Sequence, residues 1–438
     1  MKIKLTIPII ILLFSLKPVN AQKLNYKISE NANRMFLLEN YKRAKELYRE
    51  LYKKNYNNYR NKYRFGVCLV YTYERKDALS LLTNITSYGG TPREVWFHIA
   101  KAHHLDNNFD EAITNYNKYL KSDEASYQLK LRAKRNIEMC ENAKKLIQDS
   151  INVEFIPLGE EINTEYDEYF PSITPKADLL IFSTRRQGTT GRIYDLESYY
   201  TADIYSAKFK YGKWSKAKSV GPPNSYGNED CAGMSENGKY IFYYVNNPKS
   251  KNNLQLSEKG KSTYGRAIEI KSKEVNSKSN QQISATITND GNYMIFSSDR
   301  KGGMGGSDLY ISKKIKDKKD STKTTWSEPK NLGHKINTPY DDAYPYLIND
   351  GKTLLFASKG HNSMGGYDIF YIPFNPENIS TDTPTNIGYP INDTDDNTNI
   401  SFTDDKKVAY ISTFRKEGKG NLDIYKLIFN EPLPFFVK

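Results

Sequence analysis

The sequence predicts a protein of two parts, an all-α array of helical repeats followed by a closed ring of antiparallel β-sheets. Two periodicities carry this prediction. Small residues recur every 34 residues near the N-terminus, and aromatic residues recur every 54 or 60 residues through most of the remaining chain. The length of 438 residues agrees with more than one domain, because a single hydrophobic core rarely grows beyond about 250–300 residues.

Residues 1–21 have the features of a cleavable secretory signal. Lys2 and Lys4 precede an apolar run from Ile7 to Leu16, and small residues lead up to Ala21. A basic start, a short apolar core and small residues before the cut characterise such signals, and the run is too short to span a bilayer. We expect export to the periplasm, with outer-membrane association or secretion as further destinations, and no membrane span.

The excess positive charge lies in the expected helical part. The chain has a net charge of +13, and residues 22–147 hold 24 basic and 14 acidic side chains, whereas residues 148–438 hold 37 of each. A basic surface favours acidic partners or anionic polymers. The simpler alternative is that Lys-rich helices are basic because they are solvated.

Residues 22–149 predict helical repeats with a period of 34. Three alanines at that spacing each have a large residue four positions later and a small residue twelve positions earlier. These are Ala44, Ala78 and Ala112, with Tyr48, Leu82 and Tyr116 after them and Ala32, Gly66 and Ala100 before them. This is the pattern of tetratricopeptide repeats, whose small residues let two helices approach closely. We expect three repeats and a closing helix near 125–147, with a concave face suited to a peptide or a helix.

Residues 150–438 predict repeated four-stranded sheets. Aromatic residues mark the second strand of each unit at Phe182, Phe242, Phe296, Phe356 and Tyr410. An aspartate opens the third strand at Asp203, Asp308, Asp368 and Asp423, and we interpret it as a hydrogen-bonding turn residue. Four strands per unit at this period are typical of β-propeller blades. We expect five blades, or six if the segment 252–275 hides another.

An early strand is expected to close the ring. The segment from Ile151 to Gly159 resembles the fourth strand of a blade, yet it precedes the first full unit. We predict that it forms the outer edge of the last blade, whose third strand begins at Asp423. Such pairing would remove an open sheet edge.

Three motifs in one unit resemble the PD40 (WD40-like, TolB-like) propeller repeat. They are Asn337–Pro345, Asn349–Lys352 and Gly365–Phe370. The order of signal, tetratricopeptide repeats and propeller is similar to envelope proteins of Bacteroidetes, including the OmpA-family component of the type IX secretion and gliding machinery. In that family an OmpA-like peptidoglycan-binding domain usually follows, but here the chain stops nine residues after Phe429. The resemblance therefore implies a scaffold in a type IX secretion-like outer-membrane complex, without wall binding through such a domain.

The sequence offers no recognisable catalytic set. It has no Gly-x-Ser-x-Gly, His-Glu-x-x-His or Cys-x-x-Cys motif. We therefore expect no enzyme, cofactor or metal site, and a non-enzymatic periplasmic adaptor that binds envelope proteins. The alternative is a propeller that binds carbohydrate or peptidoglycan. A glycosidase, the third reading, would need paired carboxylates in the channel. No nucleic-acid partner is expected.

Two sets of residues are predicted to line one mouth of the propeller. The first set comes from acidic and aromatic loops before the first strands: Tyr166, Asp167, Tyr169, Tyr340, Asp341, Asp342 and Tyr344. The second set is basic and follows the second strands: Arg186, Arg300 and Arg415, with Arg185 and Lys359 beside them in the pattern. The basic residues could meet a carboxylate-bearing partner, or they could pair with acids of neighbouring blades.

Overall fold

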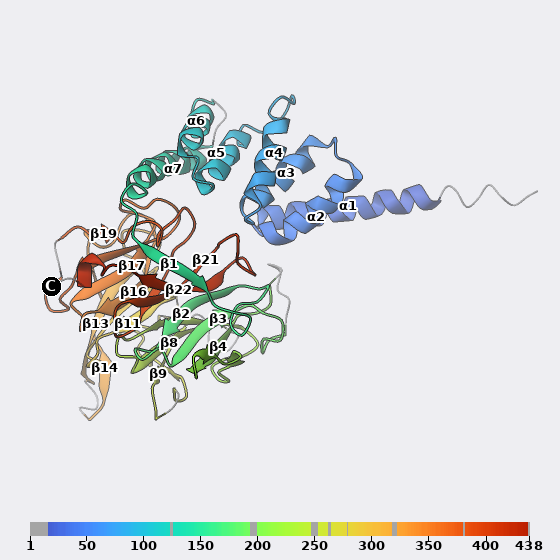
Figure 1. Ribbon diagram of the computed structural model, residues 1–438. Helices are drawn as coiled ribbons and strands as arrows, with labels where there is room; N and C mark the ends of the chain where they lie inside the picture. The colour runs from blue at the N-terminus through green and yellow to red at the C-terminus, as the bar shows by residue number, and fades with distance from the viewer. Residues whose placement is uncertain are drawn as a thin grey trace, which may run out of the picture. The chain divides into compact units, whose positions relative to one another are not determined.

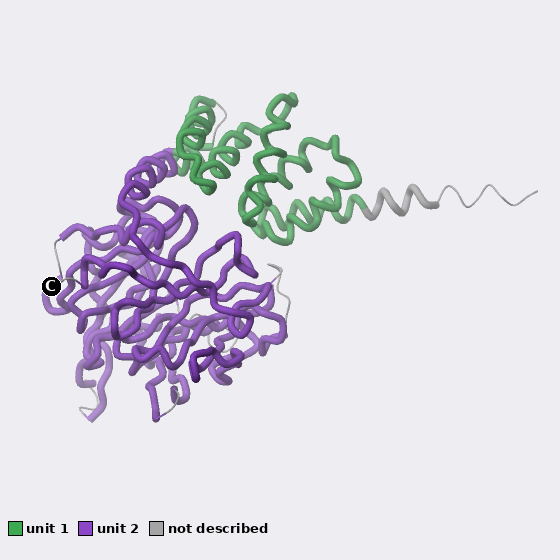
Figure 2. The backbone as a smooth tube through the Cα atoms, in the orientation of Figure 1, with its two compact units in different colours: residues 1–133, 196–198 green, residues 134–195, 199–438 purple. Residues whose placement is uncertain are grey.

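The computed structural model describes residues 16–122, 126–192, 199–246, 253–261, 264–277, 279–317, 322–379 and 382–436. Most of the predicted signal, residues 1–15, lies outside the described residues. The chain divides into two compact units, one ending at Ala133 and the other beginning at Lys134 (Figure 2). The division falls within a helix, whose second half groups with the β-sheets, rather than at residue 150.

Seven helices precede the first strand in the described chain (Figure 1). They are α1 (Leu16–Leu37), α2 (Tyr41–Lys54), α3 (Tyr59–Val70), α4 (Arg75–Ile85), α5 (Val95–Leu105), α6 (Phe109–Leu120) and α7 (Tyr127–Leu146). Asparagines fix two of the starts, because the Asn40 and Asn58 side chains accept hydrogen bonds from the N–H groups of Arg43 and Asn61, both at 3.1 Å. None of the described helices is both long enough and apolar enough to cross a bilayer.

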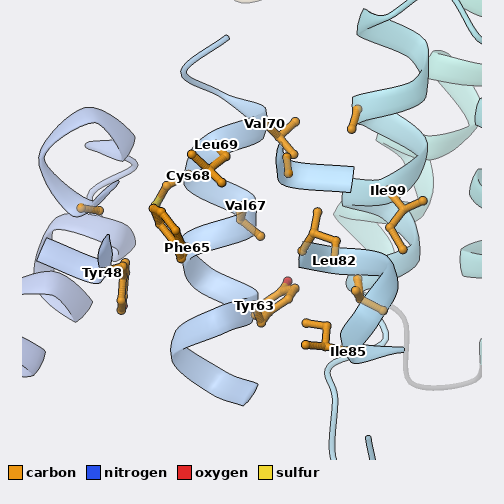
Figure 3. Packing of buried hydrophobic residues seen from close by; sticks show 14 of the residues in the cluster. Tyr48, Tyr63, Phe65, Val67, Cys68, Leu69, Val70, Leu82, Ile85 and Ile99 are labelled. Atoms are coloured by element: carbon orange, nitrogen blue, oxygen red, sulfur yellow. The ribbon is translucent and has the colours of Figure 1, made fainter. Parts of the chain in front are cut away.

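Each helix from α1 to α5 packs against the next one along the chain. Gly66 allows one of these contacts, because a Cβ atom there would lie 2.7 Å from the Cδ2 of Leu82. Ala44, Ala78 and Leu82 are fully buried, and Figure 3 shows Leu82 in the core of the unit. The small and large residues thus pack as expected, while their assignment to tetratricopeptide repeats stays a prediction.

The second unit contains a five-bladed β-propeller, which confirms the propeller part of the predicted fold and the expected number of five blades. Its first three blades are built in chain order. The first blade consists of β2 (Glu168–Ile173), β3 (Leu179–Thr184), β4 (Asp203–Lys210), β5 (Lys213–Trp214) and β6 (Lys218–Ser219). The second consists of β7 (Asn228–Met234), β8 (Tyr240–Asn246), β9 (Asn253–Glu258) and β10 (Ile268–Glu269). The third consists of β11 (Ala285–Ile287), β12 (Tyr293–Ser298), β13 (Asp308–Lys316), β14 (Thr324–Trp326) and β15 (Lys330–Asn331). The segment 252–275 therefore holds the outer strands of the second blade instead of a sixth blade.

The last two blades bring the two ends of the ring together (Figure 1). The fourth blade consists of β16 (Asp342–Ile348), β17 (Thr353–Ser358), β18 (Asp368–Pro373) and β19 (Thr385–Asn386). The fifth consists of β20 (Ile400–Phe402), β21 (Val408–Thr413), β22 (Asp423–Phe429) and the early strand β1 (Val153–Pro157). Strand β1 pairs antiparallel with β22, Val153 opposite Phe429 and Pro157 opposite Tyr425. The predicted closure of the ring is confirmed. A short 3-10 helix, η1 (Pro434–Phe436), follows.

The aspartates that open the third strands hold the Gly-rich turns before them. The Asp308 carboxylate accepts the N–H of Met304 at 2.6 Å, and Asp368 accepts that of Met364 at 3.0 Å. Asp203 accepts the N–H of Thr190 at 2.8 Å in the same way. Their interpretation as turn hydrogen-bonding residues is confirmed.

Candidate functional site

The first strands of the blades pack against one another around a central channel that side chains nearly fill. Contacts link β2 with β7 and β20, and β11 and β16 with β7. The cavity that remains has a volume of about 30 Å³, and its lining includes Phe170, Cys231, Tyr344, Tyr346 and Asn399. A space of this size holds about two water molecules. Around this cavity, side chains therefore fill most of the channel.

Two bulged strands aim aromatic rings at this channel. Phe170 in β2 and Tyr344 in β16 have φ values of 51° and 53°, and the strand register shifts at both places. A proline follows each ring, at Pro171 and Pro345, which fits a bulge because proline cannot donate to a β-ladder. Left-handed backbone at a bulky residue costs of order 1–3 kcal/mol and concentrates at functional sites. The two bulges therefore indicate that this end of the channel is the candidate functional site.

Four rings form a continuous row across the mouth at this end, and we call Tyr169, Phe170, Tyr344 and Tyr367 the aromatic row. The ring centroids of Tyr169 and Phe170 lie 5.0 Å apart, and those of Phe170 and Tyr344 also lie 5.0 Å apart. Tyr344 meets Tyr367 edge to face at 5.6 Å. Tyr169, Phe170 and Tyr344 remain partly exposed, whereas Tyr367 is buried. The row thus offers ring surface to a ligand at this mouth, which we call the open mouth.

Charged groups lie at both ends of the aromatic row. At one end the Tyr169 hydroxyl donates to Oδ1 of Asp230 at 2.6 Å, and Nε of Arg185 donates to the same hydroxyl at 3.4 Å. Burial raises the pKa of Asp230, while the Tyr169 hydrogen bond and the Arg185 charge oppose that rise. At the other end, Nζ of Lys359 lies 2.9 Å from Oδ2 of Asp341.

Some predicted site residues lie at this mouth. Tyr169 and Tyr344 belong to the aromatic row, and Asp341 lies beside it. Tyr166 packs its ring 5.6 Å from Tyr200, in the loop that precedes β2. Asp167 is 8% exposed, and its carbonyl accepts the N–H of Arg185 at 3.0 Å.

Two other predicted residues have contacts inside the second unit. Asp342 is buried and accepts the N–H of Thr338 at 2.6 Å and the hydroxyl of Ser358 at 2.5 Å. Burial raises the pKa of Asp342 to about 7. Tyr340 lies under the guanidinium of Arg135 from α7, 4.9 Å from the ring centroid. Asp342 is thus a brace of its blade, and Tyr340 is a packing residue.

The three predicted arginines do not gather at a rim. Arg186, Arg300 and Arg415 each lie over two aromatic rings within one blade. The pairs are Phe182 and Tyr205, Phe296 and Tyr310, and Phe155 and Tyr425. Arg186 also forms an ion pair of 3.1 Å with the buried Glu168. These arginines pack within their own blades, whereas the alternative expected them to pair with acids of neighbouring blades.

The opposite mouth of the channel is sealed. The carboxylate of Glu236, in the turn after β7, accepts the N–H groups of Asn349 and Asp350 at 2.8 Å each, and it meets Nζ of Lys406 at 2.7 Å. These contacts join three blades. The ring of Phe436 lies 5.5 Å from the Lys406 ammonium, so the segment after the last blade packs there too. We call this end the sealed mouth.

The described residues contain no group of three or more His, Cys, Asp and Glu side chains that could hold a metal ion. Phe170, Asp230 and Tyr367 are site residues that the sequence reasoning missed. A signal existed for Phe170, because an aromatic residue followed by proline recurs in β2 and β16. Asp230 has no such signal, since the second blade departs from the repeat.

No protein-family model matches the chain, and no curated protein matches it. A solved glycoside hydrolase is 10% identical with a TM-score of 0.41, over 67% of this chain and 95% of that one. An α-L-arabinofuranosidase from Lactobacillus brevis is 12% identical with a TM-score of 0.29, over 61% and 77%. The tricorn protease is 14% identical with a TM-score of 0.28, over 62% and 28%. Likenesses this weak carry no information on activity.

Proposed function

We propose that the protein is a non-enzymatic scaffold of the cell envelope that binds a partner protein at the open mouth of its propeller. The observation that carries this proposal is the contrast between a filled channel and an aromatic row of which three rings are partly exposed. Tyrosine and phenylalanine are enriched at protein interfaces, where their rings supply contact area at low entropic cost. The helical unit supplies a second, basic surface, as the charge of residues 22–147 indicates.

The filled channel also argues against glycoside hydrolysis. Small-molecule sites usually enclose about 300–1,000 Å³, whereas the channel cavity measures about 30 Å³. A glycosidase needs two carboxyl groups flanking the bond to be cleaved. The acidic residues that open two of the first strands, Glu168 and Asp342, are instead occupied by hydrogen bonds within their blades. Binding without catalysis is the function that these contacts support best.

The envelope location and the type IX secretion-like complex rest on the leader-like N-terminus and on the repeat motifs of the propeller. Within that proposal the protein lies in the periplasm, near or at the outer membrane. The expected partners are envelope proteins, and peptidoglycan is the alternative ligand of the open mouth.

The test is capture from solubilised envelopes with the tagged full chain. The variant Phe170→Gly/Tyr344→Gly removes two rings of the aromatic row, and both positions have the backbone that glycine adopts readily. We expect the double variant to lose partners that the unaltered chain and the control Tyr211→Ala retain, since Tyr211 is 98% exposed and lies outside the row.

Two results would contradict the scaffold proposal. One is capture that does not differ between the double variant and the control. The other is release of sugar from a polysaccharide by the purified chain, abolished by Asp230→Asn. Sedimentation of the unaltered chain with purified peptidoglycan, lost in the double variant, would instead identify the alternative ligand.

A further inference from the structure

The aromatic row presents a surface that attracts cations. Phe170 and Tyr344 are partly exposed, and their rings lie 5.0 Å apart at an interplanar angle of 35°. The face of an aromatic ring carries partial negative charge, so ammonium and guanidinium groups bind within about 6 Å of its centre. Neutral apolar ligands would also fit such rings, so the surrounding charges decide whether the surface prefers a cationic or a neutral ligand.

Carboxylates surround the row more densely than cations do. After burial, the charges of Asp396, Asp230 and Asp341 raise the pKa of Tyr344 above its ordinary range. The contacts agree with this: Asp230 accepts the Tyr169 hydroxyl, Asp396 accepts the N–H of Tyr367 at 2.8 Å, and Asp341 pairs with the Lys359 ammonium that lies over Tyr367. The described cations beside the row are Arg185 and Lys359. The balance of these groups is negative, which favours a positively charged ligand.

Lys359 shows how this surface holds a cation. Its ammonium lies 4.5 Å from the ring centroid of Tyr367 and 2.9 Å from the Asp341 carboxylate. Ring face and carboxylate thus bind one ammonium together at one end of the row. At the other end, the Asp230 carboxylate accepts the Tyr169 hydroxyl, and the ring of Phe170 lies 5.0 Å from that of Tyr169. The direct hydrogen bonds to Asp230 come from the neutral hydroxyls of Tyr169 and Ser183, and the charge of Arg185 acts on it from nearby.

An acceptor lines the cavity below the rings. Nδ2 of Asn399 donates to the carbonyl of Pro171 at 2.9 Å, and that carbonyl fixes the orientation of the amide because it can only accept. The remaining atom, Oδ1 of Asn399, is buried and has no hydrogen-bond partner among the described residues. A buried acceptor needs a donor. Either a water molecule in the cavity or the N–H tip of a side chain that enters the mouth would supply it.

We propose that the open mouth is a receptor for one lysine or arginine side chain of the partner protein, seated on Phe170 and Tyr344 and paired with Asp230. The inference rests on the proposed scaffold function and names the group that is recognised.

The first test selects random twelve-residue displayed peptides on the full-length chain and then measures synthetic copies by fluorescence anisotropy. We expect the selected peptides to share a lysine or arginine at one position. Replacing that residue by acetyl-lysine or citrulline keeps its shape and removes its charge, and we expect affinity to fall roughly tenfold or more.

Variants of the receptor locate the binding. Asp230→Asn is isosteric and Tyr344→Gly suits the local backbone, and we expect each to weaken binding roughly tenfold. The controls Glu269→Gln and Tyr211→Ala, both exposed and outside the mouth, should leave affinity unchanged. Lys359→Met removes the cation at the far end of the row and leaves the mouth more negative, so we expect it to strengthen binding. Thermal unfolding checks that each variant is folded. If Tyr344→Gly does not fold, Asp230→Asn still tests the proposal.

The outcomes distinguish this inference from the scaffold function. Peptides that depend on Tyr344 but bind equally well with citrulline would overturn the cation receptor and leave the scaffold standing. Failure to select any peptide that depends on Asp230 or Tyr344 would also overturn it. The scaffold function fails separately, if envelope capture is insensitive to loss of the aromatic row.

Discussion

The two mouths of the propeller channel are built from the same repeat but use their side chains differently. At the sealed mouth, one carboxylate, that of Glu236, accepts two backbone N–H groups and pairs with Lys406. At the open mouth, two residues have left-handed backbone and leave their rings partly exposed. A surface whose polar groups are all hydrogen-bonded within the protein contributes to stability. A surface with a strained backbone and partly exposed rings is available for binding.

The largest effect is expected where the seal is broken. Glu236→Ala leaves two N–H groups without their acceptor and Lys406 without its counter-ion, so we expect the free energy of unfolding to fall by about 2–3 kcal/mol. Urea denaturation measures it. Glu236→Gln keeps an oxygen acceptor for the N–H groups and should lose about half as much. Equal stability of all three proteins would show that this network does not hold the mouth shut.

A smaller effect is expected from pH at the open mouth. The pKa of Asp342 is raised to about 7 by burial, while the donors Thr338 and Ser358 favour its charged form. A carboxyl whose pKa is higher in the folded state stabilises the fold fully below about pH 4, and that stability is lost as pH rises through 7. We expect a decrease of about 1–2 kcal/mol between pH 4 and 8, measured by denaturation. The decrease should shrink in Asp342→Asn, and an unchanged pH dependence in that variant would contradict the assignment.

The smallest effect on stability is expected at the aromatic row itself. Tyr344→Gly removes ring contacts but relieves a left-handed backbone that costs of order 1–3 kcal/mol, so the free energy of unfolding should change by less than about 1 kcal/mol. The matched control is Tyr346→Ala, two residues along the same strand, whose ring packs against a buried cluster. Its loss should cost about 2–4 kcal/mol. Similar costs at both positions would mean that the open mouth is ordinary core.

The fold could be predicted because its determinants repeat. The aromatic residue of each second strand and the aspartate of each third strand mark the blades, and β1 was identified by its likeness to a fourth strand. The second blade shows the limit of this reasoning, since Asn253 replaces the aspartate and the sheet still forms. Packing between neighbouring blades supplies what the local sequence lacks.

The site could be predicted only as a region. Asp341 and Asp342 are adjacent, yet one lies beside the aromatic row and the other braces its blade. Arg185 and Arg186 differ in the same way. Alternate residues of a strand point to opposite faces, so residue type alone could not separate them. Asp230 was beyond prediction because its blade has Gly233 at the bulge, with φ 135°, where β2 and β16 carry rings.

The pairing of β1 with β22 has a consequence for biosynthesis. Val153 leaves the ribosome long before Phe429, its partner across the ladder, and contacts so distant in sequence slow folding. Until the last strand is made, the first one has an unsatisfied edge that could join a foreign chain. The nascent protein should therefore depend on a holding chaperone until its C-terminal strand emerges. Truncation within β22 would leave β1, more than 250 residues earlier in the chain, without its partner strand.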